Sequence, residues 1–120
     1  MITSREEATD ILMKWYNEHT PITALFSSSG TPFAVKVSGF INGITSNVLI
    51  SDSSADATTR PENYLLVPTH DVQSYQYVEA NELGLSAEEL AFVTSKEGAA
   101  SLSLIFADGR RLSLFEREAS

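Results

Sequence analysis

The sequence predicts an α+β domain in which an N-terminal helix is followed by a strongly bent antiparallel sheet, a second helix and a C-terminal β-hairpin. Three observations support this fold class: an apolar stripe with helical spacing near the N-terminus, apolar alternation with a period of two along most of the chain, and an Asp-Gly pair near the C-terminus. At 120 residues, a division would leave halves too small to bury a stable core each. We therefore expect residues 1–120 to form a single domain.

The first helix is predicted from Ser4 to His19. Ser4 and Glu7 have the spacing of a capping box, in which the hydroxyl accepts a hydrogen bond from a free backbone N–H and the carboxylate reaches back. Thr20-Pro21 ends the helix, because the residue before a proline disfavours the helical conformation. Between these limits, apolar residues recur at the spacing of one helix face: Ala8, Ile11, Leu12 and Trp15.

A strand pattern follows, with β-branched and aromatic residues over 22–26, 33–41, 48–50, 64–67 and 72–78. Gly39 and Gly43 lie inside this pattern, where glycines often mark a bulge or a sharp bend. We therefore expect the sheet to bend there. The polar residues 51–60 are predicted to form a loop.

The C-terminal third predicts a short helix and a hairpin. Ser86 and Glu89 form a second capping-box pattern, and the helix is expected to end near Gly98. Asp108-Gly109 separates two alternating segments, 102–106 and 112–114, and this is the strongest short-range signal for a hairpin.

Composition restricts the classes of function. Sixteen acidic and eight basic residues give a net charge of −8, which repels phosphate backbones and disfavours nucleic-acid binding. The absence of cysteine excludes disulfides, thiolate metal sites and a cysteine nucleophile. The sequence shows neither a signal-peptide pattern nor a run of ~20 apolar residues, so we expect a soluble, cytoplasmic protein that does not bind membranes.

No catalytic, cofactor or metal site is predicted. His70 and Asp71 could supply a base and a carboxylate, but neighbours on an extended chain point to opposite faces. The acidic residues Asp52, Asp56 and Glu62 do not have the spacing of a calcium-binding loop, and no phosphate-binding loop is present.

Residues 33–77 carry two short patterns that are typical of one protein family. The first consists of apolar alternation, glycines in the bent strand, and an asparagine leading into an apolar strand: Val35, Val37, Gly39, Gly43, Asn47, residues 48–50 and Asp52. The second, which in that family begins with Arg-Gly, has here the spacing of Pro68-Thr69, His70-Asp71, Val72, Gln73-Ser74 and Tyr75. The chain thus resembles the Sm-like family of small, strongly bent barrels.

This resemblance implies a helix followed by a bent five-stranded barrel, and rings made by pairing strands of neighbouring subunits. In that family, RNA is bound by an Asp and an Asn after the bent strand and by the Arg of Arg-Gly. Asn47 matches the family's Asn. The family's Asp has no counterpart in this sequence, and Pro68-Thr69 stands in the place of Arg-Gly. The resemblance therefore implies an Sm-like shape without the RNA-binding residues.

We expect first a non-catalytic binding or interaction module that self-associates through strand edges into a homo-oligomer, with another protein as a further partner. A single-stranded RNA binder of the Sm-like kind is the alternative, and a hydrolase using His70 is a third. Tyr75 and Tyr77 share a strand face and could form an aromatic surface for stacking or for a partner. The candidate binding residues are Asn47, His70, Tyr75, Tyr77, Arg110 and Arg111.

Overall fold

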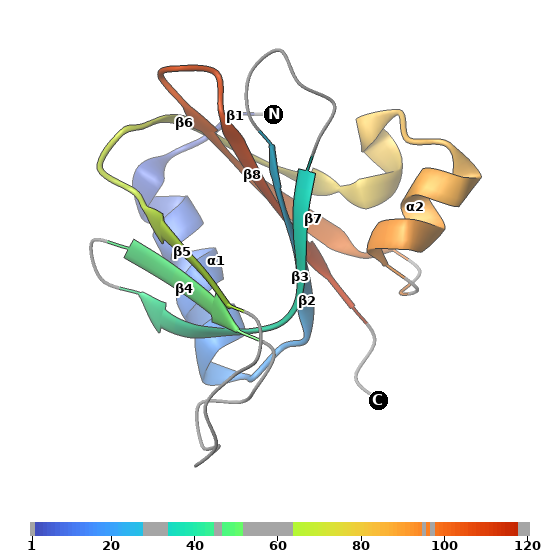
Figure 1. Ribbon diagram of the computed structural model, residues 1–120, viewed down its shortest axis with the longest axis horizontal. Helices are drawn as coiled ribbons and strands as arrows, with labels where there is room; N and C mark the ends of the chain where they lie inside the picture. Colours follow the sequence, from blue (N-terminus) through green and yellow to red (C-terminus); the bar gives the residue numbers. More distant parts are fainter. Residues whose placement is uncertain are drawn as a thin grey trace.

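An antiparallel sheet that bends on itself accounts for most of the structure, a computed structural model that describes residues 2–27, 34–44, 47–51, 64–94, 96 and 98–117 (Figure 1). Its strands are β1 (Ile2–Thr3), β2 (Ile22–Ser27), β3 (Ala34–Ile44), β4 (Asn47–Ser51), β5 (Tyr64–Pro68), β6 (Val72–Glu79), β7 (Ala100–Phe106) and β8 (Arg111–Glu116). The order across the sheet is β1-β6-β7-β8-β2-β3-β4-β5. Together with the helices α1 (Arg5–Asn17) and α2 (Ala87–Val93) and the 3-10 helix η1 (Ala80–Leu83), this arrangement confirms the α+β class.

The first helix begins where the sequence predicts. Ser4 caps α1, and its hydroxyl oxygen accepts a hydrogen bond of 3.1 Å from the backbone N–H of Glu7. Ala8, Leu12 and Trp15 are buried, and α1 packs on β3 and β6. The predicted stripe is therefore confirmed, although the helix ends at Asn17 and not at His19.

Strand β3 bends the sheet because it changes its partner in mid-course. Residues 34–39 pair with β2, whereas the register with β4 starts at Phe40, opposite Ser51. The register also shifts between Ile41 and Gly43, which places a bulge at Asn42. Gly39 and Gly43 thus lie at the partner change and at the bulge, as predicted.

Two cores lie on opposite faces of the sheet. The larger core packs α1 against the bent sheet and includes Trp15, Ile50 and Leu114. The smaller core lies under η1 and α2, and it contains Phe115, the next residue along β8 after Leu114. Because successive residues of a strand point to opposite faces, β8 supplies apolar side chains to both cores.

The predicted C-terminal hairpin is confirmed, and it lies between β6 and β2. Gly109 has a φ of 92°, and Asp108 Oδ1 accepts a hydrogen bond of 3.1 Å from the Arg110 N–H. In the described part of the chain, the order of strands runs from β1 at one end to β5 at the other. The sheet is therefore open in that part, and the structure does not show a closed barrel.

Three details differ from expectation. Strand β1, which pairs with β6, and the 3-10 helix η1 were not predicted from the sequence. Helix α2 ends at Val93 and not near Gly98, because Thr94 is extended and its hydroxyl donates a 2.6 Å hydrogen bond to the Glu116 carbonyl oxygen. Ser51, predicted as the first residue of the loop 51–60, is instead the last residue of β4, and residues 52–60 and Glu62 lie outside the described residues.

We predict that Gly39→Val destabilises the fold by about 1–3 kcal/mol, because Gly39 is buried where β3 changes partner and a branched side chain would overpack that position. Gly98→Ala is the control: its φ of 69° costs about 1 kcal/mol for a non-glycine residue, and a Cβ there meets no atom within 4 Å. Urea midpoints of both variants measure the difference. Equal or reversed losses would contradict a tight bend at Gly39.

Candidate functional site

The predicted binding residues Asn47 and His70 lie at the start of β4 and in the turn after β5. Asn47 starts β4 opposite Pro68 of β5, and the exposed His70 follows in the next turn. The Asn42 amide donates to the hydroxyl of Ser51, which lies at the other end of β4. His70 Nε2 lies 3.3 Å from a carboxylate oxygen of its neighbour Asp71, and both side chains are exposed. The arrangement is that of a solvated turn.

The two tyrosines share a face of β6, but they do not form an aromatic surface. Tyr75 is only 8% exposed and belongs to the larger core. Tyr77 is 37% exposed, and its pKa is raised by partial burial and then by the negative charge of Glu116. Only Tyr77 of this pair could therefore contact a partner.

Arg110 and Arg111 are engaged on opposite faces of the hairpin. Arg110 Nε lies 2.7 Å from Asp108, whose pKa it lowers, and its guanidinium lies 5.0 Å from the Phe106 ring centre. Arg111 Nη2 donates to Gln76 Oε1 at 3.3 Å and to Ser103 Oγ at 3.2 Å. The two side chains therefore do not form one basic patch.

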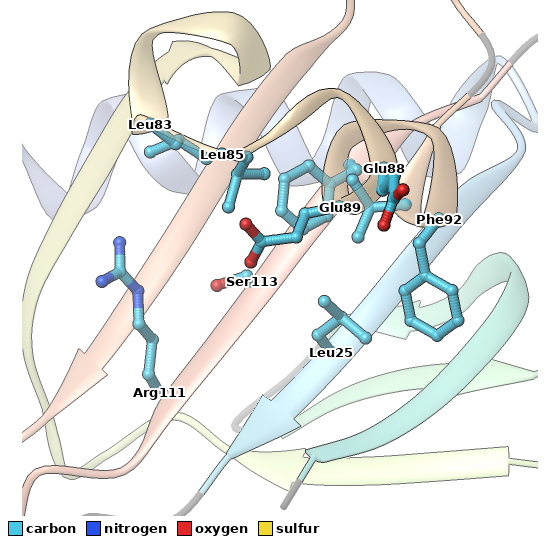
Figure 2. Close-up of a pocket in the computed structure, with 10 residues that line it drawn as sticks. Leu25, Leu83, Leu85, Glu88, Glu89, Phe92, Arg111 and Ser113 are labelled. Carbon is cyan, nitrogen blue, oxygen red and sulfur yellow. The ribbon is translucent and has the colours of Figure 1, made fainter. Parts of the chain in front are cut away.

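A hollow of about 470 Å³, which was not predicted from the sequence, lies between α2, η1 and the outer face of β2 and β8 (Figure 2). This volume lies within the range of small-molecule sites. Apolar side chains on both faces of β2 and β8, such as Leu25 beside Ala24 and Phe115 beside Leu114, were the available signal. The lining residues are Leu25, Leu83, Leu85, Glu88, Glu89, Phe92, Val93, Arg111, Ser113 and Phe115.

Helix α2, which covers this hollow, is fixed at both ends. A full capping box holds its start: the Glu89 N–H donates to Ser86 Oγ, and the Ser86 N–H donates to Glu89 Oε1, both at 3.1 Å. At its end, Lys36 Nζ donates to the Phe92 carbonyl oxygen at 3.0 Å and lies 3.9 Å from the Phe92 ring centre. Strand β3 is thereby tied to α2.

The edge strand β5 is the second surface of interest. It pairs only with β4 among the described strands, so its other edge is unpaired there. Tyr64 and Leu66 are 58% and 55% exposed, and residues two apart on a strand share a face. None of the five residues of β5 is charged.

Comparison with known proteins found no matching family model, no similar curated protein and no similar solved structure. Among the helices that the structure describes, none is both long and apolar enough to cross a membrane. The described residues also contain no group of three or more His, Asp or Glu side chains arranged to hold a metal ion. The hollow and the β5 edge are therefore the two candidate functional features in the described part of the chain.

We predict that Ser86→Ala loosens α2. Loss of an N-cap costs about 1 kcal/mol, which corresponds to about fivefold faster hydrogen exchange at the Leu90 and Thr94 amides, both bonded within α2. Ser4→Ala removes the cap of α1 and is the matched control. Unchanged exchange in α2 of Ser86→Ala would show that packing alone holds the helix.

The capping box should also respond to acid. Hydrogen bonds from the backbone and side chain of Ser86 lower the pKa of Glu89 from its ordinary value of 4.5. A lowered pKa gives stabilisation that is present above 4.5 and is lost as the pH falls through the folded value. We expect protection factors in α2 to fall on acidification in the wild type and to stay flatter in Glu89→Gln, whose amide oxygen accepts without titrating. Equal acid sensitivity would contradict the role of Glu89.

Proposed function

We propose that the protein is a non-catalytic interaction module that self-associates through the free edge of β5. The observation that supports this proposal is an uncharged edge strand that exposes two large apolar side chains, Tyr64 and Leu66. Unpaired strand edges are templates for pairing with another chain, and folded proteins normally protect them with charges, bulges or shortening. Apart from Pro68 at its end, β5 has none of these protections.

The other edges are better protected. Strand β1 has two residues and already pairs with β6 at Tyr75 and Gln76. The N-terminal half of β3 pairs with β2 on one side but not with β4 on the other. This second edge carries Lys36, and a lysine on an edge strand discourages pairing with another chain. β5 is therefore the edge that best suits a partner strand.

A second copy of β5 fits this edge better than a head-to-tail neighbour does. Two antiparallel β5 strands related by a twofold axis would bring Tyr64 and Leu66 of both copies into one contact, with no like charges between the strands. A ring of the kind that the Sm-like resemblance implies needs a second free edge. Here β1 covers the middle of β6, so a closed dimer is the simpler assembly.

The other expectations gain no specific support. RNA binding would rely on Asn47, Arg110 and Arg111, yet Arg110 is paired with Asp108, and Arg111 is bonded to Gln76 and Ser103. A hydrolase would rely on His70, whose ring contacts only the exposed Asp71 among the interactions described for it. Both alternatives stay predictions.

We expect light scattering coupled to size-exclusion chromatography to show a concentration-dependent dimer. Leu66→Lys should weaken it at least about 100-fold, because two leucine side chains, each contributing about 1.5–3 kcal/mol when buried, lose their contact and two like charges approach each other. Met13→Lys introduces the same charge at an apolar residue of α1 that is 40% exposed, and it should leave the dimer intact. A wild type that is monomeric at millimolar concentration would refute the proposal, as would equal losses in both variants.

A further inference from the structure

We propose that the hollow under α2 binds a small aliphatic monocarboxylate, with its chain along the apolar walls and its head at Arg111. This site is separate from the β5 edge and does not depend on self-association. The proposal rests on the shape and lining of the hollow and on the partly buried guanidinium of Arg111, which has no acidic partner among the described residues.

The walls suit a flexible hydrocarbon chain. Leu25 and Phe115 form the floor on the sheet, while Leu85 and Val93 face them from the helical side. Phe92 is 60% exposed and lies at the end of the hollow away from Arg111 (Figure 2). Burial of an aliphatic chain between these residues would remove apolar surface from water on both partners.

Arg111 supplies the polar end. Its Nη2 is occupied by Gln76 and Ser103, both uncharged, and its Nε is shielded from solvent without a hydrogen-bond partner among the described residues. In that part of the chain, no carboxylate forms an ion pair with it either. A partly buried cation without an acidic partner carries a desolvation cost, which an anionic ligand would offset. The chain has twice as many acidic as basic residues, so an arginine without an acidic partner is unexpected in it.

Two acidic residues also line the hollow, and they set the direction of the ligand. Glu88 and Glu89 are exposed, so water and salt screen their charges, and the Glu89 carboxylate is held by the Ser86 N–H. Both lie on α2, whereas Arg111 lies on β8 at the Leu83 end (Figure 2). A carboxylate head is therefore favoured at the Leu83 end and disfavoured beside α2.

The direct test is calorimetric titration of the full chain with saturated monocarboxylates of increasing length, each below its micelle concentration. Affinity should rise about fourfold per methylene, the equivalent of about 0.8 kcal/mol, until the chain outgrows the hollow. Decanoate should bind at least about tenfold more tightly than decanol, because only the acid gains a charge-assisted hydrogen bond. Amide shifts in α2 and β8 locate the site.

Arg111→Gln should abolish the preference for decanoate while decanol binding stays within about twofold, which shows that the hollow is intact. Arg110→Gln changes the neighbouring arginine in the turn and should keep the full preference. Phe92→Ala, at an exposed position, should weaken acid and alcohol alike. Equal binding of acid and alcohol by the wild type, tighter binding of decylamine, or no binding at any chain length would each overturn the proposal.

Discussion

The partner change of β3 after Gly39 is the constraint on which the rest of the structure depends. Because residues 34–39 pair with β2 and residues 40–44 pair with β4, the last two strands turn away from the main sheet and enclose the core with α1. The same change has two consequences for function. Among the described strands, it leaves β5 as an unpaired end of the sheet, and it leaves the outer edge of residues 34–39 without a partner. Lys36, in this half of β3, reaches the end of α2.

A second set of contacts joins the layers on both sides of the sheet, and it centres on Glu116. Its carboxylate accepts hydrogen bonds from Trp15 Nε1 at 3.1 Å and from the Ala100 N–H at 2.8 Å, and it lies 3.5 Å from Lys96 Nζ. Its carbonyl oxygen accepts from the Thr94 hydroxyl just after α2. A mostly buried carboxylate is tolerable because these donors satisfy it. One residue of β8 thus positions α1, β7 and the end of α2 together.

Local structure could be predicted from the sequence more fully than the pairing of strands. The caps at Ser4 and Ser86, the hairpin at Gly109 and the run of strands follow from signals within a few residues. The insertion of β7 and β8 between β6 and β2 depends on contacts between distant segments, and alternation assigns a face without naming a neighbour. The hollow was missed for that reason. Arg110 and Arg111 were grouped as candidate binding residues, and neither their engagement on opposite faces nor the partners of Arg111 were predicted.

The order of the strands separates the two candidate surfaces. The hollow is bounded by β2, β8 and α2, whereas β5 lies beyond β3 and β4 at the end of the sheet. A strand added at β5 would extend the sheet at the end away from β2, one of the strands that line the hollow. A dimer formed there would therefore carry two independent hollows, and occupancy of one surface need not alter the other. In the part of the chain that the structure describes, Lys36 ties the bent strand to the cover of the hollow, because its bond to the Phe92 carbonyl oxygen runs from the half of β3 that does not pair with β4. That contact and the backbone of β3 are therefore the connections between the two surfaces through which assembly and ligand binding could be coupled.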